Sequence, residues 1–300
     1  MTIDGSQFFG PWEEVVETWS DWSDAVDLIE RVAGSGQQLA WRGVANASYS
    51  LHSSLYRRLA SPGKLPEEKD LVRFEERLLR TARAAWRFDQ MPAMELLAHV
   101  QHFGGPTRLL DVTFSPLIAL WFAVEERLDP DGRPAADTDG RLIAFNVTGR
   151  SVELDAVWGG RDLPWATKDP SEWRRGLPYI WRPPSYNERI PAQNSAFLVG
   201  GVPMFGAGDN SKYYRKGRGA ASSPGFWRIA EVRQATSINT RLNTLKRTAI
   251  EGVTPATYTV RITAAAKREI RRRLETTHGL SVASIYPDLY GFATRGAVHP

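Results

Sequence analysis

Apolar residues recur at helical spacing in six stretches of the chain, and residues that start or stop helices bound several of them. The first stretch follows Ser23, the predicted N-cap, and ends at Gly34-Ser35-Gly36. Ser115-Pro116 is a strong helix start, because serine caps free backbone N–H groups and proline suits the first turn. The predicted helices cover residues 23–33, 67–88, 92–103, 115–123, 237–250 and 264–276.

Shorter apolar runs between turn-forming residues predict β-strands. They cover residues 38–44, 107–112, 141–147, 179–181, 189–190, 196–199, 227–232 and 257–262. Strands and helices are mixed along the chain, with no internal repeat and no convincing linker. We therefore expect one α+β domain.

The composition excludes several classes of protein. Hydrophobic residues make up 42% of the 300 positions and charged residues 24%, which are ordinary globular proportions. The chain has no cysteine, which excludes disulfides, thiolate zinc sites and a cysteine nucleophile, and fits a reducing cytosol. It shows neither a signal-peptide pattern nor an apolar run of about 18 residues. We expect a soluble, cytoplasmic protein without a membrane partner.

Basic residues are concentrated in one late segment. The whole chain has a formal charge of +4, whereas residues 208–250 contain nine basic and two acidic residues. Tyrosines interleaved with basic side chains suit stacking on bases beside phosphates. A solvated insertion is the simpler alternative, and the sequence leaves both open. The candidate nucleic-acid contacts are Lys212, Tyr213, Tyr214, Arg215, Lys216 and Arg218.

The residues best suited to chemistry lie between His99 and Pro116. This segment places two imidazoles, a glycine turn, an arginine, a carboxylate and two hydroxyls around a strand-to-helix junction. Such a helix start is a natural site for an anion such as a pyrophosphate. The segment lacks the pattern of a zinc hydrolase, a serine hydrolase or a phosphate loop. For Ser115 alone, a capping role is the simpler interpretation.

Four motifs, three of them in or next to this region, resemble the FRG domain, which is named for a Phe-Arg-Gly sequence. They are Trp41-Arg42-Gly43, with tryptophan in place of phenylalanine, Gln101-His102-Phe103-Gly104, Pro106 to Thr113, and Ser115 to Ala123. The resemblance continues at residues 187–197 and 285–291. It implies a single FRG-type domain over residues 1–300, with an N-terminal helical segment at 1–37 and a basic insertion at 200–255.

The order of these motifs also bears a weaker resemblance to ADP-ribosyltransferases. That resemblance implies a split central β-sheet flanked by helices, with Arg42 gripping the NAD phosphates or ribose. Thr113 and Ser115 would shape the nicotinamide pocket, and Glu188, with Gln193 as a rival, would be the late catalytic group. Arg42, Glu188 and Gln193 are thus the candidate catalytic residues. The residues assigned to NAD are Arg42, Gly43, His102, Arg108, Asp111, Thr113 and Ser115.

The resemblances together predict an NAD-dependent ADP-ribosyltransferase that modifies a macromolecule, with DNA or RNA among the expected targets. Such an enzyme would be a bacterial toxin or antiphage effector, accompanied by a cognate antitoxin, and would use NAD as co-substrate and no metal. The alternative is a non-catalytic nucleotide- or nucleic-acid-binding module of a defence system. The sequence leaves open the acceptor, the oligomeric state, whether Glu188 or the adjacent Arg189 faces a cleft, and whether the protein is catalytic.

Overall fold

The computed structural model describes residues 3–129, 131, 133–155, 158–166, 173–174, 176–204, 214–215, 225–245 and 256–296. Four of the predicted nucleic-acid contacts, Lys212, Tyr213, Lys216 and Arg218, lie outside these ranges. Tyr214 and Arg215 form strand β8, of which only the backbone is described. The prediction for this segment therefore stays untested.

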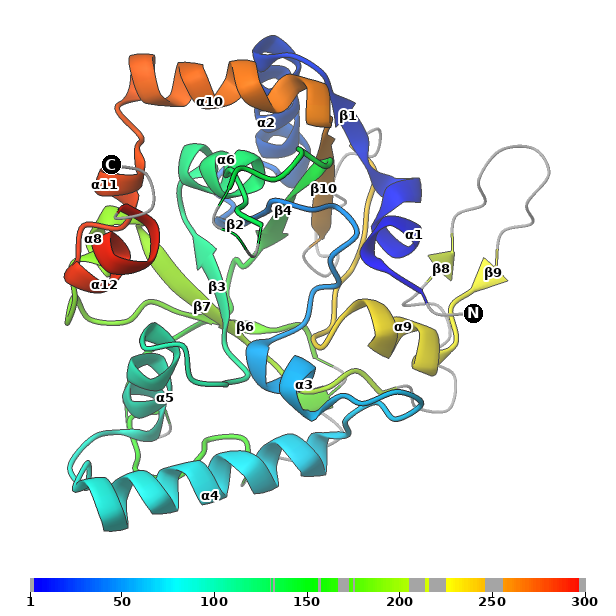
Figure 1. Ribbon diagram of the computed structural model, residues 1–300. Helices are drawn as coiled ribbons and strands as arrows, with labels where there is room; N and C mark the ends of the chain where they lie inside the picture. Colours follow the sequence, from blue (N-terminus) through cyan, green and yellow to red (C-terminus); the bar gives the residue numbers. More distant parts are fainter. Residues whose placement is uncertain are drawn as a thin grey trace.

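A single mixed sheet of eight strands forms the centre of the protein, in the order β1-β10-β4-β2-β3-β7-β6-β5 (Figure 1). β1 pairs with β10 and β5 with β6 in parallel, and the other neighbours are antiparallel. The strands are β1 (Glu14–Val16), β2 (Leu39–Val44), β3 (Leu110–Thr113), β4 (Gly140–Asn146), β5 (Ser151–Val152), β6 (Tyr179–Trp181), β7 (Ser195–Val199) and β10 (Thr257–Ile262). A separate pair joins β8 (Tyr214–Arg215) to β9 (Gly225–Phe226).

The two halves of the sheet meet at a narrow joint between β2 and β3. β2 pairs with β4 over six residues, and β3 pairs with β7 over four. Between β2 and β3, in contrast, only Trp41 and Thr113 are in register. The strands therefore part on either side of this pair, and the residues next to it are free to line an opening.

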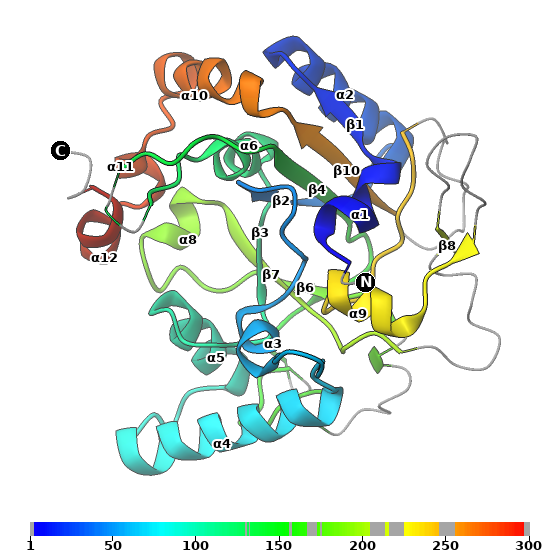
Figure 2. The same ribbon diagram turned by 45° about the vertical axis from the view of Figure 1, so that its right-hand side comes forward.

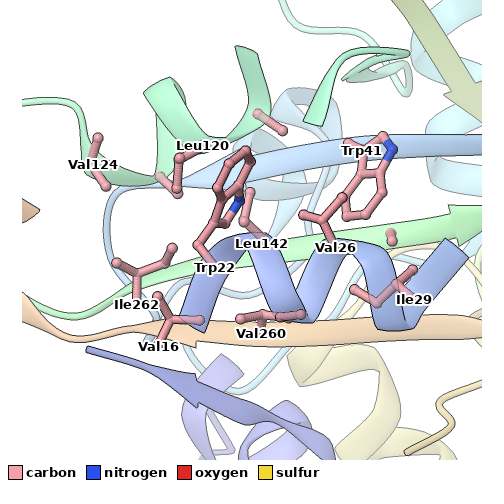
Figure 3. Close-up of a cluster of buried hydrophobic side chains, with 14 of the residues drawn as sticks. Val16, Trp22, Val26, Ile29, Trp41, Leu120, Val124, Leu142, Val260 and Ile262 are labelled. Atoms are coloured by element: carbon pink, nitrogen blue, oxygen red, sulfur yellow. The ribbon is translucent and has the colours of Figure 1, made fainter. Parts of the chain in front are cut away.

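Helices cover both faces of the sheet (Figures 1 and 2). α2, α6 and α10 pack on one face, where Trp22, Leu120 and Ile270 belong to a core that also includes Trp41 of β2. Figure 3 shows Trp22, Leu120 and Trp41 of this core. α1 and α9 cover the other face, and α4 and α5 pack beside the β7-β6 half. The helices are α1 (Gly5–Phe9), α2 (Trp19–Ala33), α3 (Ser54–Leu59), α4 (Glu68–Trp86), α5 (Ala93–His102), α6 (Pro116–Val124), α8 (Arg189–Ala192), α9 (Ile229–Ala235), α10 (Ala264–His278), α11 (Val282–Ile285) and α12 (Leu289–Gly291).

Most of the predicted elements are present. The helices α4, α5, α6 and α10 and the strands β2, β4, β6, β7 and β10 lie within about two residues of their predicted bounds. α2 begins earlier than predicted, because Thr18 rather than Ser23 is its N-cap. The Thr18 hydroxyl accepts the Asp21 N–H, and the Asp21 carboxylate accepts the Thr18 N–H.

Three predicted elements were wrong. Residues 189–190 begin helix α8, because the Asn187 side chain accepts the backbone N–H groups of Arg189 and Ile190 and so starts a helix. Residues 229–235 form helix α9 instead of a strand, since a short apolar run does not distinguish the two. Residues 237–245 of the helix predicted at 237–250 are not helical, and their backbone bonds to neighbouring segments, as in the Asn243 N–H to Thr257 carbonyl bond. Residues 246–250 lie outside the described ranges.

β3 is shorter than its predicted span, because Thr107 and Arg108 precede the paired residues. Across the described ranges, the structure contains no helix of the length and apolar character needed to cross a bilayer.

Candidate functional site

A cleft of about 320 Å³ lies beside the joint between β2 and β3. Residues of β2, β3 and β7 line it, together with residues of α5 and α8 and with Tyr286. Its volume falls at the lower end of the range for small-molecule sites, about 300–1,000 Å³. The cleft therefore brings together segments from residue 41 to residue 286.

Arg42 supplies a positive charge to the cleft. Its side chain is 20% exposed, and Nη1 donates a hydrogen bond to the main-chain carbonyl of Asp111 and lies 4.0 Å from the Asp111 carboxylate. Burial lowers the pKa of the Arg42 guanidinium, and the Asp111 carboxylate partly offsets this effect. An arginine nevertheless keeps its charge in proteins, so the remaining N–H groups can bind an anion.

Packing explains the two residues that flank Arg42 in the Trp41-Arg42-Gly43 motif. Trp41 is buried in the core and pairs with Thr113. A Cβ on Gly43 would lie 1.8 Å from the Ala119 carbonyl oxygen, so only glycine lets α6 pack against β2 here. Gly43 thus has a packing role, whether or not it also approaches a ligand.

Asp111 is the only carboxylate among the described residues that line the cleft. Its side chain is 68% exposed, and Oδ1 accepts a hydrogen bond of 2.7 Å from the Gln101 amide. Gln101 is itself held by the Thr107 hydroxyl, which donates to its carbonyl oxygen. In the described ranges no group of three or more His, Asp or Glu side chains is placed to hold a metal ion.

Aromatic side chains form much of the remaining wall. Tyr186 stacks on His99 with 4.0 Å between the ring centroids, and Phe122, Phe197 and Tyr286 also line the cleft. Burial raises the pKa of the Tyr186 hydroxyl, and nearby carboxylates raise it further. The hydroxyl therefore stays protonated at neutral pH and can donate a hydrogen bond.

Three charged or titratable side chains meet where Arg189 and His102 line the cleft. Arg189 contacts both carboxylate oxygens of Asp288, at 2.6 and 2.8 Å, and its guanidinium lies about 5 Å from the rings of Tyr286 and Tyr290. His102 Nε2 lies 3.7 Å from the same carboxylate. Because Arg189 and His102 line the cleft, this contact makes the segment after α10 part of its wall.

Burial and neighbouring charges determine the protonation states of Asp288 and His102. Burial favours the neutral form of Asp288, but the bonds from Arg189 and the Gly291 N–H outweigh it and lower the pKa of the carboxyl. Burial also lowers the pKa of the His102 imidazole, and Arg189 lowers it further. At neutral pH the carboxylate is charged and the imidazole is neutral.

Replacing Asp288 by alanine is expected to lower the free energy of unfolding by about 2–3 kcal/mol, because it leaves a largely buried guanidinium unpaired. Asp89 provides a matched control, since it pairs with Arg87 at 3.9 Å on the surface. Asp89→Ala should lower the free energy of unfolding by less than about 0.5 kcal/mol. Urea denaturation of both variants measures the difference. Equal effects would show that the pair does not hold the 285–291 segment.

The cleft brings together six of the nine residues predicted for NAD or catalysis, and three lie elsewhere. Arg42, Gly43, His102, Asp111, Thr113 and Gln193 line it. Ser115 caps α6, where its hydroxyl accepts the Ile118 N–H at 3.3 Å. Glu188 is exposed and lies outside the lining, whereas the adjacent Arg189 lines the cleft.

Arg108 belongs to a buried cluster of charges outside the lining of the cleft. It is 1% exposed, donates two bonds of 2.6 Å to Glu75 and one of 2.7 Å to Glu68, and lies 4.5 Å from the Trp165 ring. Burial opposes the charge of Arg108, but the two carboxylates outweigh it and raise the pKa of the guanidinium. The cluster ties α4 to the start of β3.

Several cleft residues were not predicted from sequence as site residues. Gln101 and Tyr286 lie within motifs that resemble the FRG family, which was a usable signal. Arg189 also lies within such a motif, and the sequence left open whether it or Glu188 faces a cleft. Tyr186 had no comparable signal, because its role depends on a contact with His99, far away in the sequence.

Comparison with known proteins gives one match, which covers part of the chain. No curated protein and no solved structure matches it significantly. The model of the FRG domain family matches residues 37–132, a range that includes Arg42, Gln101, His102, Asp111 and Thr113. The cleft residues of α8, β7 and the 285–291 segment lie beyond that match. Residues 37–132 are therefore similar to the FRG domain family.

Proposed function

We propose that the protein is an NAD-dependent ADP-ribosyltransferase that modifies a macromolecule, and that the cleft holds NAD. One observation carries the proposal: the Arg42 guanidinium, the Asp111 carboxylate and aromatic rings face a single cleft. The sheet is continuous, but a single residue pair joins β2 to β3, and this narrow joint supports the split-sheet part of the proposal.

Arg42 would bind the pyrophosphate. A guanidinium suits this group because it donates two parallel hydrogen bonds and keeps its charge when partly buried. The rings of Tyr186, Phe122 and Tyr286 offer flat apolar surfaces for the nicotinamide or adenine. A cation beside aromatic walls is thus a combination that fits a dinucleotide better than a simple sugar or a peptide.

Asp111 would be the carboxylate that acts on the ribose. When the bond from ribose C1′ to the nicotinamide nitrogen breaks, its electron pair moves to the nicotinamide and positive charge develops on the ribose. A nearby carboxylate stabilises that charge. An acceptor oxygen then bonds to C1′ and releases its proton to solvent or a base. Asp111 takes the role that the resemblance gives to Glu188, because Glu188 lies outside the lining of the cleft.

Two isosteric variants test this assignment. We expect Asp111→Asn to lower kcat for nicotinamide release about 10²–10³-fold, because it removes the charge and can keep the bond from Gln101. Glu188→Gln should change kcat less than about twofold. Chromatography of released nicotinamide measures both. The reverse order of effects would assign the role to Glu188.

An experiment on the wild-type protein tests which class of reaction it catalyses. After incubation with NAD, mass spectrometry of protein and nucleic acid should show added ADP-ribose. If neither nicotinamide release nor a modified acceptor appears, the transferase proposal is refuted. Retention of nucleotide or nucleic acid without turnover is the outcome expected of a non-catalytic binding module.

A further inference from the structure

Transfer of ADP-ribose needs a group that takes the proton of the acceptor, and few residues of the cleft can do so. Arg42 and Arg189 are cations and keep their protons. Tyr186 and Tyr286 keep theirs as well, because burial raises the pKa of both hydroxyls. Asp111 is the carboxylate assigned to the ribose. Among the titratable side chains of the described lining, one histidine remains.

This histidine, His102, has a ring nitrogen available for the task. Its side chain is 14% exposed and lines the cleft. The ring forms no hydrogen bond with the residues that the structure describes, and its ion-pair contact there is with Asp288, 3.7 Å from Nε2. The preceding residue, Gln101, donates its amide to the Asp111 carboxylate at 2.7 Å. His102 therefore brings a neutral nitrogen base to the cleft that contains the ribose carboxylate.

The charged groups around His102 suit a base. Arg189 of α8 and His99 of α5 disfavour the imidazolium and Asp288 favours it, and with burial the net effect is a lower pKa of the imidazole. The ring is thus neutral at neutral pH, as a base must be before it reacts. Once it has taken a proton, the Asp288 carboxylate stabilises the new charge. Figures 1 and 2 show α5, α8 and α12 on the same side of the molecule.

A neutral base beside a carboxylate also limits the kind of acceptor. A carboxylate acceptor has no proton to lose at neutral pH, and the exposed Asp111 carboxylate repels it. An amine acceptor is a cation at neutral pH and is not a nucleophile until it has lost a proton. A hydroxyl is neutral, and its proton becomes acidic only while the oxygen bonds to carbon. A base in the cleft is therefore of most use to a hydroxyl acceptor.

We propose that His102 is the general base of the transfer and that the acceptor group is a hydroxyl. The electron pair of the bond between C1′ and the nicotinamide nitrogen leaves with nicotinamide. The acceptor oxygen bonds to C1′, and its proton moves to the free nitrogen of the His102 ring and then to solvent. This inference rests on the proposed function and extends it by naming the base and the acceptor chemistry. It differs from the NAD-binding role that the resemblance implies for His102, because a base acts on the acceptor.

Two probe acceptors separate a base from an NAD-binding residue. Methanol loses a proton when it bonds to C1′, whereas the azide anion has none to lose. His102→Gln is expected to lower kcat for nicotinamide release with water or methanol by about 10²–10⁴-fold. Azide should restore release by the variant to within about tenfold of the wild type, and the Kd for NAD should change less than about twofold. Chromatography measures nicotinamide and the hydrolysed, methyl and azido products of ADP-ribose.

The pH dependence gives a second readout. The wild-type kcat with methanol should be full above the pKa of the His102 imidazole and fall about tenfold per pH unit below it. His102→Gln should lack this fall. His278→Gln is the matched control, since His278 is exposed and ends α10 as His102 ends α5. This control should keep the wild-type kcat and pH profile.

Several results would overturn the proposal. They are unchanged methanolysis by His102→Gln, a loss that azide does not restore, and a raised Kd for NAD with unchanged kcat, which would return His102 to NAD binding. Azido product without methyl product from the wild type would exclude a hydroxyl acceptor. If the wild type releases no nicotinamide with any acceptor, the transferase proposal itself fails, so the two failures are distinguishable.

Discussion

Replacing Arg108 by methionine is expected to lower the free energy of unfolding by about 3–5 kcal/mol. The change leaves the Glu75 carboxylate, which is fully buried, without the two hydrogen bonds that Arg108 donates to it. Glu68 also loses its bond of 2.7 Å. Burying an unpaired carboxylate is costly because the protein interior solvates charge poorly. Urea denaturation followed by tryptophan fluorescence measures the loss.

A double-mutant cycle separates this pairing from simple loss of packing. Arg108→Met combined with Glu75→Met should be less destabilised than the sum of the two single variants by at least about 2 kcal/mol, because the buried pair is then removed together. Arg108→Lys keeps the charge and part of the bonding, so it remains measurable if the methionine variant does not fold. Additive effects would contradict the buried-pair account. Normal stability with lost NAD turnover would favour the NAD role that the family resemblance implies for Arg108.

Much of the fold could be predicted from local patterns. α6 was predictable because Ser115 and Pro116 form a strong start before an apolar run, and the Ser115 hydroxyl does cap the helix. β2 and β10 were predictable as short apolar runs that end at glycine or before a helix. α8 and α9 were mistaken for strands, because a helix of one or two turns has no periodicity long enough to recognise.

The site could be predicted in part. Arg42, His102, Asp111 and Thr113 lie in motifs of the family resemblance. Arg42 is on β2, and Asp111 and Thr113 are on β3, which pairs with β2 directly. His102 ends α5, the helix that precedes β3. The contact between Arg189 and Asp288 could not be predicted, because these residues are 99 positions apart and their contact depends on tertiary packing. The exposure of Glu188 likewise follows from α8, which the sequence did not indicate.

Replacing Arg42 by alanine is expected to lower kcat/KM for NAD by about 10²–10⁴-fold. The variant loses two charged hydrogen bonds to the pyrophosphate, each worth about 1.5–3 kcal/mol. The kcat/KM of Arg42→Lys should lie between those of Arg42→Ala and the wild type, because an ammonium keeps the charge but not the paired donors. Steady-state kinetics of nicotinamide release measures all three proteins.

Arg57 provides the matched control for charge near the cleft. It is exposed, lies close enough to affect the Arg42 guanidinium, and is absent from the described lining. Arg57→Ala should change kcat/KM less than about threefold. If Arg57→Ala lowered kcat/KM as much as Arg42→Ala, the effect of Arg42 would reflect the general electrostatic potential near the cleft and not a direct contact with NAD.

A crystal structure of the protein with NAD tests the central claim most directly. The account predicts the pyrophosphate within hydrogen-bond distance of the Arg42 guanidinium and the nicotinamide ribose beside the Asp111 carboxylate. Ordered NAD at any other place on the protein, with the cleft between β2 and β3 left open, would contradict it.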